Sequence, residues 1–250
     1  MTPALQTIGI GKNFGGIAAA NDLSFKLEKG ARHALIGPNG AGKTTFVNLL
    51  TGMLRPTRGR ILLDGEDITR LAPYERVRRG IARTFQISQL FADLTPLETI
   101  CLAVSERLGS GADWWRPRGV RPEVTDELVE VLRLFRLADV MRERTATLAY
   151  GRQRLLEIAV ACACKPRVLL LDEPMAGVPA GESDEILDTL AALPEDVSVL
   201  LIEHDMDLVF RFASRISVLV DGELLTEGPA GEIARDPRVR AAYLGEATYA

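Results

Sequence analysis

The stretch GPNGAGKT, Gly37 to Thr44, constrains the fold of this chain more than any other. It matches the pattern G-x-x-x-x-G-K-[ST] at every fixed position. The preceding stretch ARHALIG is typical of a short buried strand, and the following KTTFVNLLTG is typical of a helix that ends at Gly52. A strand, a glycine-rich loop and a helix in this order predict an α/β fold with a phosphate site.

The residue types of this loop suit a nucleotide. Glycines let backbone N–H groups curl around an anion, and the start of the helix adds the positive end of its dipole. Lys43 can reach the β- and γ-phosphates, and the Thr44 hydroxyl can coordinate Mg²⁺. A glycine turn that merely contains Lys and Thr would lack these flanking elements. The residues expected to contact the nucleotide here are Gly37, Pro38, Asn39, Gly40, Ala41, Gly42, Lys43, Thr44 and Thr45.

A second element, VLLLDE, supplies acidic groups. A buried strand would deliver Asp172 at its end, where the carboxylate can enter the Mg²⁺ shell. Glu173 follows directly and can act as the general base that polarises the attacking water. An acidic residue at a strand end is often only a surface residue, but two together in a chain with a phosphate loop favour a catalytic role.

The remaining elements predict a β-rich start, a helical middle and a return to alternating strands and helices. Residues 96 to 165 read as a mostly helical insert, with Leu128, Val131, Leu132 and Phe135 at helical spacing. Within it, GSGADWWRPRGVRP is typical of an exposed loop, whose two tryptophans either contact a partner or pack locally. The other predicted strands and hairpins are LSFKLEKG, RILLDGEDI with a turn at Asp64-Gly65, VSVLLIEHD, and ISVLVDGELLTEG with a turn at Asp221-Gly222.

Composition excludes several classes of protein. The chain is 47% hydrophobic and 26% charged with a formal net charge of -4, so no basic excess favours nucleic acid. No apolar run approaches the roughly 20 residues that span a bilayer. The first residues, MTPALQTIG, lack the layout of a signal peptide. Cys162 and Cys164 lie two apart in a predicted helix, so they point in different directions and make a poor metal pair.

The order of these motifs resembles the ATPase subunits of ABC transporters. The phosphate loop is followed by RTFQ, then a helical segment with LAYGRQR, then LLLDEP and LIEHD. The resemblance implies that Gln86 senses Mg²⁺ and the attacking water. It also implies that His204 contacts the γ-phosphate and holds Glu173, and that Phe14 stacks on adenine, although a strand phenylalanine is as a rule part of the core. It runs from about Ile8 to Ala247.

The resemblance narrows to the ATPase subunit of branched-chain amino-acid importers, with importers of urea and short amides sharing the pattern. The family signature Leu-Ser-Gly-Gly-Gln would be represented by Leu148, Ala149, Tyr150, Gly151 and Arg152. Ala149 and Tyr150 look like traits of this branch, whereas Arg152 is individual and could equally be a solvated cap. A second departure is Pro179, where the branch usually has Asn in the segment that crosses to the partner ATPase.

The resemblance implies a fold and an assembly. The expected fold is a P-loop NTPase (RecA-like) α/β core with an N-terminal antiparallel β-subdomain and an inserted α-helical subdomain. Residues 1–86 and 165–250 would form the core and residues 87–164 the helical subdomain. Two ATP molecules, each with Mg²⁺, would lie between this chain and a second ATPase subunit, identical or related. The pair would drive membrane permease subunits through a groove near Gln86 to Asp93, at the cytoplasmic face of the membrane, with a separate solute-binding protein acting indirectly.

The sequence is also compatible with other functions. A non-transport ABC ATPase of DNA repair or translation usually has a long coiled coil or two cassettes, and neither is evident here. A regulatory nucleotide-binding module would fit the altered signature and Pro179, but the residues that bind Mg-ATP and polarise water are all present. A GTPase would need an [NT]-K-x-D motif, which is absent, and a small-molecule kinase leaves LAYG and EHD unexplained.

Overall fold

The computed structural model describes residues 2–84, 90–109 and 122–244. Contacts within the chain divide it into two units. We call them the core unit, which comprises Met1–Arg83, Arg167–Glu173 and Pro194–Ala250, and the helical unit, which comprises Thr84–Pro166 and Pro174–Leu193. The contacts thus group residues 174–193 with the helices. The boundaries expected from the sequence stay a prediction.

A six-stranded sheet forms the centre of the core unit, and all of its neighbouring strands are parallel except β9 and β10. The two predicted strands VLLLD and SVLLI are buried along their whole length, as parallel strands covered on both faces should be. In spatial order the strands are β10 (Glu223–Pro229), β9 (Arg215–Val220), β3 (Arg32–Ile36), β8 (Ser198–Ile202), β7 (Val168–Asp172) and β6 (Ile81–Arg83).

A four-stranded antiparallel sheet completes the β-structure of the core unit, in the order β2-β1-β4-β5. Both predicted Asp-Gly turns are confirmed: Asp64 and Gly65 join β4 to β5, and Asp221 and Gly222 join β9 to β10, all with positive φ. The strands of this sheet are β1 (Leu5–Phe14), β2 (Ile17–Leu27), β4 (Arg58–Leu63) and β5 (Glu66–Asp67).

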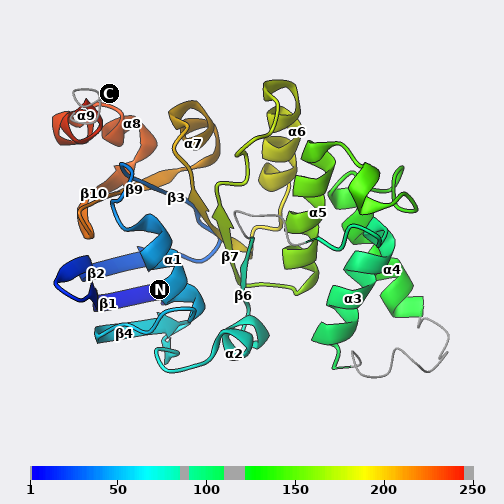
Figure 1. Cartoon of the computed structure of the whole chain (residues 1–250), viewed down its shortest axis with the longest axis horizontal. Helices are drawn as coiled ribbons and strands as arrows, with labels where there is room; N and C mark the ends of the chain where they lie inside the picture. The colour runs from blue at the N-terminus through cyan, green and yellow to red at the C-terminus, as the bar shows by residue number, and fades with distance from the viewer. Residues whose placement is uncertain (1, 85–89, 110–121, 245–250) are drawn as a thin grey trace. The chain divides into compact units, whose positions relative to one another are not determined.

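The side chains of β3 show why helices cover both faces of the central sheet. Leu35 packs in a core cluster with Phe46 and Leu50 of helix α1 (Lys43–Thr51) and with Leu5 of the antiparallel sheet. Helix α1 therefore lies between the two sheets (Figure 1). Ala34 and Ile36 point the other way because side chains alternate along a strand. The opposite face carries α7 (Met206–Phe212), α8 (Ala230–Ile233) and α9 (Pro237–Leu244), while α2 (Pro73–Arg78) contacts β6.

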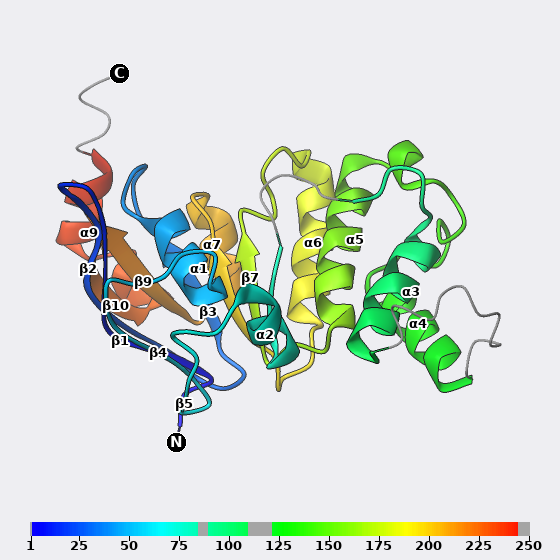
Figure 2. The same cartoon turned by 60° about the horizontal axis from the view of Figure 1, so that its bottom comes forward.

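In the described part of the helical unit four α-helices pack together, with α5 in contact with the other three (Figure 2). Leu128, Leu132 and Phe135 are buried and Val131 is partly buried, which confirms the amphipathic pattern. Thr95 and Glu98 form a reciprocal capping box at the start of α3. The described helices of this unit are α3 (Pro96–Arg107), α4 (Pro122–Leu134), the short 3-10 turn η1 (Thr145–Thr147), α5 (Tyr150–Ala163) and α6 (Ala180–Ala191).

Candidate nucleotide site

The predicted phosphate loop connects β3 to α1. Gly40 and Gly42 have φ values of 78° and 99°, a conformation that side chains other than glycine rarely adopt. A Cβ at Gly42 would lie 2.5 Å from the Ala19 carbonyl oxygen, whereas a Cβ at Gly40 would meet nothing within 4 Å. The loop is therefore pressed against β2 at Gly42 and open at Gly40, where an anion can approach.

Lys43 lies folded across this loop. Its ammonium donates hydrogen bonds to the carbonyl oxygens of Gly37, at 2.5 Å, and Pro38, at 2.9 Å. The charge is thus held within the loop, beside the first-turn N–H groups of α1 that have no intrahelical partner. Lysine, loop amides and helix start together make a site suited to phosphate oxygens.

Strand register brings the other predicted groups of the core unit to the same edge of the sheet. Ile202 of β8 pairs with Leu35 of β3 on one side and with Asp172 of β7 on the other. The segments that follow these three parallel strands therefore leave the sheet at the same level. Since neighbouring strands are about 4.8 Å apart, the ends of β3 and β7 are roughly 10 Å apart. This spacing leaves room for a nucleotide phosphate and a metal ion between them.

Asp172 is buried and is held by an arginine that the sequence analysis did not assign. Arg83 of β6 donates to Asp172 at 2.7 Å and to the Asn48 side chain of α1 at 2.6 Å. Thr44 and Asp172 offer hydroxyl and carboxylate oxygens, the donor types that Mg²⁺ prefers, so these residues fit the metal. Among the described residues, no group of three or more His, Cys, Asp or Glu side chains could hold a metal ion by itself.

Glu173 has a backbone conformation that few side chains adopt. Its φ is 48°, and its N–H donates to the Ile202 carbonyl oxygen at 2.9 Å. Such strain persists only where surrounding contacts impose it, and it is concentrated at functional sites. The conformation fixes the point at which the Glu173 side chain leaves the sheet edge.

His204 follows the neighbouring strand and is well exposed. Its Nδ1 lies 3.9 Å from Glu173 Oε1 and 3.7 Å from Glu203 Oε2, both beyond hydrogen-bond distance. Glu203 is 1% exposed and accepts a hydrogen bond from the His204 backbone N–H at 3.2 Å. The structure thus brings His204 and Glu173 together. Glu203 was not predicted, although it is part of the quoted LIEHD stretch.

Phe14 ends β1 and is 47% exposed, with the Lys12 ammonium 5.4 Å from its ring centroid. An exposed ring at this position is available for stacking, unlike a core phenylalanine. The strand that follows, β2, reaches the phosphate loop at Ala19, as the close approach to Gly42 indicates. Its role in adenine binding stays a prediction.

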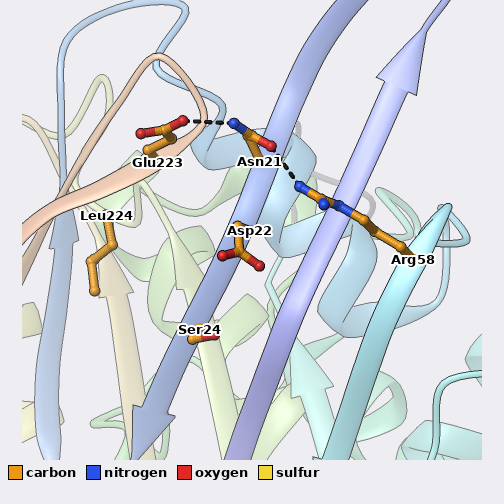
Figure 3. Close-up of a pocket in the computed structure, with 6 residues that line it drawn as sticks. All are labelled: Asn21, Asp22, Ser24, Arg58, Glu223 and Leu224. Atoms are coloured by element: carbon orange, nitrogen blue, oxygen red, sulfur yellow. Dashed lines mark hydrogen bonds between the residues drawn. The ribbon is translucent and has the colours of Figure 1, made fainter.

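A chain of hydrogen bonds links the antiparallel sheet to the phosphate loop through Asn21. The Asn21 side chain accepts from Arg58 and donates to Glu223, each at 2.6 Å (Figure 3). The Asn21 backbone N–H donates to Gly222, whose own N–H donates to Ala41 in the loop. The side chains of Asn21, Arg58 and Glu223 also border an open pocket in the core unit. It is lined by Asn21, Asp22, Ser24, Arg58, Glu223 and Leu224 (Figure 3).

The predicted signature residues lie at the start of α5 in the helical unit. Ala149 occupies the N-cap position and makes no side-chain capping hydrogen bond. The Gly151 N–H instead donates to the Glu182 carboxylate of α6 at 2.8 Å. Leu148 is buried, and the Tyr150 hydroxyl donates to the Ala176 carbonyl oxygen at 3.2 Å.

The structure describes both residues that depart from the family pattern, Arg152 in the signature and Pro179 in the segment after Glu173. The Arg152 guanidinium donates to the Arg136 carbonyl oxygen and lies 3.5 Å from Asp139 and 3.6 Å from Glu185. These contacts belong to the helical unit, so a contact between Arg152 and the nucleotide stays a prediction. Pro179 is the N-cap residue of α6.

Some predicted features lie outside the described residues. Gln86 falls in residues 85–89, with part of the expected permease groove, and the two tryptophans fall in residues 110–121. Among the residues that are described, no helix is both long and apolar enough to cross a lipid bilayer.

Comparisons with known proteins place the chain in a family. Residues 20–176 match the ABC transporter family, and residues 223–249 match the family described as branched-chain amino acid ATP-binding cassette transporter. The high-affinity branched-chain amino acid transport ATP-binding protein BraF of Pseudomonas aeruginosa is 40% identical, over 98% of this chain and 99% of its own length.

Solved structures similar to this chain also belong to ABC transporter cassettes. A crystal structure of an ATP-binding cassette of an ABC transporter in its ADP conformation has a TM-score of 0.85 at 30% identity, over 98% of this chain and 100% of the other. A bacterial ABC transporter cassette solved as a dimer has a TM-score of 0.76 at 25% identity, over 90% of this chain and 98% of the other. The predicted P-loop NTPase fold is thereby confirmed, and the chain belongs to the ABC transporter family as one of its ATP-binding cassettes.

Proposed function

We propose that this chain is the ATP-binding and hydrolysing subunit of an ABC importer for branched-chain amino acids or related small solutes. The shared register of β3, β8 and β7 is the observation that supports ATP hydrolysis by this chain. It gathers the phosphate loop, Asp172 with Glu173, and His204 along one edge of a single sheet. The match of residues 223–249 and the likeness to BraF support the class of solute.

In the proposed reaction each side chain has one task. The loop amides and the Lys43 ammonium bind the β- and γ-phosphates of ATP. Thr44 and Asp172 would hold Mg²⁺, which would supply positive charge to offset the charge that develops on the phosphates. Glu173 accepts a proton from the attacking water. His204 lies beside Glu173, from where it orients that carboxylate and contacts the γ-phosphate.

We further propose that a second ATPase subunit completes the site. The dimeric cassette at 25% identity supports this assembly. In it, the start of α5, including Gly151, would face the ATP bound to the phosphate loop of the partner. Membrane permease subunits would bind the pair at the cytoplasmic face of the membrane, and a solute-binding protein would deliver the solute to the permease.

Glu173→Gln tests the catalytic assignment. In the reconstituted transporter we expect ATP turnover to fall about 10²- to 10⁴-fold, because the amide cannot accept the proton of water. Binding of a fluorescent ATP analogue should persist, since Glu173 is not a ligand of the nucleotide.

Glu66→Gln is a matched control, since Glu66 is an exposed glutamate of β5. It should turn over ATP at the wild-type rate. Unchanged hydrolysis by Glu173→Gln would contradict the role of Glu173 as the base.

A further inference from the structure

The N-terminus of α5 already holds an anion that belongs to this chain. Helix α5 has 14 residues, and its first-turn N–H groups have no partner within the helix. The Glu182 carboxylate occupies this position and accepts from the Gly151 N–H at 2.8 Å. A Cβ on residue 151 would clash with the Glu182 carboxylate oxygen, so glycine is the residue that permits this approach.

Pro179 explains why Glu182 reaches α5 rather than its own helix. A glutamate at the third helical position ordinarily turns back to accept from the N–H of its own N-cap residue. Glu182 is the third residue of α6, whose N-cap is Pro179. Proline has no N–H, so this local partner is chemically absent. Ala149 in turn lacks a side chain that could cap α5. Glu182, which has no local N–H partner, takes the place of that missing cap.

We propose that Glu182 competes with the γ-phosphate of the partner's ATP for the start of α5, and that it must leave the Gly151 N–H when the dimer closes. This rests on the proposed function, in which Gly151 faces that phosphate. A carboxylate and a phosphate oxygen are both anionic acceptors for the same N–H group, and two anions at one helix end repel each other. The competition therefore raises the ATP concentration that closure requires.

Glu182→Gln tests the proposal in the assembled transporter. The glutamine keeps an oxygen acceptor for Gly151 but removes the charge. Because a single charge at a helix end has a modest effect, we expect the KM for ATP to fall about three- to tenfold. The kcat should stay within about twofold, and the melting temperature should hardly change since the hydrogen bond can persist.

Two further variants make the outcome specific. Asp188→Asn removes an exposed charge from the same helix α6 and should leave the KM unchanged. Gly151→Asp places a carboxylate on α5 itself and should abolish turnover while the phosphate loop still binds a fluorescent ATP analogue.

The results distinguish a failure of the Glu182 proposal from a failure of the proposed function. If Glu182→Gln leaves the KM unchanged or raises it while Gly151→Asp is inactive, Glu182 is only a structural cap and the inference is wrong. If Gly151→Asp turns over ATP like the wild type, or if the wild-type transporter hydrolyses no ATP, the proposed function itself fails.

Discussion

His33 is buried in the central sheet and takes no part in the proposed reaction. The residue is 1% exposed. The Ser217 hydroxyl donates to the Glu227 carboxylate at 2.8 Å, so its oxygen accepts from His33 Nε2, also at 2.8 Å. Burial lowers the pKa of His33 to about 4, although the negative charge of Glu227 opposes the shift. The folded protein therefore holds this imidazole neutral.

This pKa predicts an acid-sensitive fold. The unfolded chain protonates His33 below about pH 6.5, whereas the folded chain does so only near pH 4. The free energy of unfolding should therefore fall as the pH drops from 6.5 to 4, by about 2–3 kcal/mol from this group. Urea unfolding of the wild type and of His33→Gln across this range measures the contribution. Equal pH dependence in both proteins would contradict it.

The sequence predicted candidate site residues that stand at fixed places in motifs, and it missed the residues that contact them from distant parts of the chain. Asp172, Glu173 and His204 follow apolar stretches, so their positions at strand ends are visible in the sequence. Arg83 is 89 positions from Asp172 and meets it only through strand pairing. Glu182 likewise reaches Gly151 from another helix, and no local pattern signals such a contact.

At the scale of elements, a buried arginine joins α2 to the helix of the phosphate loop. Arg76 is 1% exposed and donates to the carbonyl oxygens of Leu49 and Leu50, both at 2.7 Å, at the end of α1. It also donates to Thr69, at 2.9 Å, in the segment before α2. Leu49 and Leu50 lie in the last turn of α1, where carbonyl groups have no N–H partner four residues further along the helix.

Arg76→Met should destabilise the core unit. The substitution removes the guanidinium hydrogen bonds to the carbonyl oxygens of Leu49, Leu50 and Thr69, so we expect a loss of about 2–4 kcal/mol in the free energy of unfolding. Arg78→Met removes an exposed arginine of the same helix and should cost no more than about 0.5 kcal/mol. Chemical denaturation of both variants makes the comparison, and equal losses would show that burial of the guanidinium is unimportant.

Elements with strong local patterns were predictable. The strands around the phosphate loop, the two Asp-Gly hairpins and the amphipathic helix α4 all follow from periodicity and turn residues. The assignment of α6 to the helical unit does not follow from such patterns, because it depends on packing against α5. The N-cap residues of these two helices, Ala149 and Pro179, also make no side-chain capping hydrogen bond. At α5 the N-cap residue supplies no capping group, and the distant Glu182 accepts from the Gly151 N–H instead.

At the scale of the whole molecule, the proposed cycle requires both units and other chains. The core unit carries the phosphate loop and the acidic residues proposed to act in hydrolysis, and the helical unit carries the start of α5. The net charge of -4 gives no global attraction to nucleic acid, which agrees with a cassette that works with protein partners. The solute contacts none of these residues in the proposed assembly, so its identity must be measured in transport.

A strain that lacks this protein should lose uptake of labelled leucine, isoleucine and valine. The wild-type gene should restore uptake, whereas Glu173→Gln should not, because the permease would lack the energy of hydrolysis. Glu66→Gln serves again as the control that restores it. Loss of urea or short-amide uptake alone, with leucine uptake intact, would contradict the branched-chain assignment.

The position of β3 has a consequence for synthesis on the ribosome. Both sheet neighbours of β3, which are β8 and β9, come from the last quarter of the chain, and so does Gly222, whose N–H holds Ala41 of the phosphate loop. A nascent chain can thus expose the whole GPNGAGKT motif long before the strands that flank it exist. The site can be assembled only after residues 198–222 have been translated, so a chain that stops before them carries the motif without the strands that complete its site.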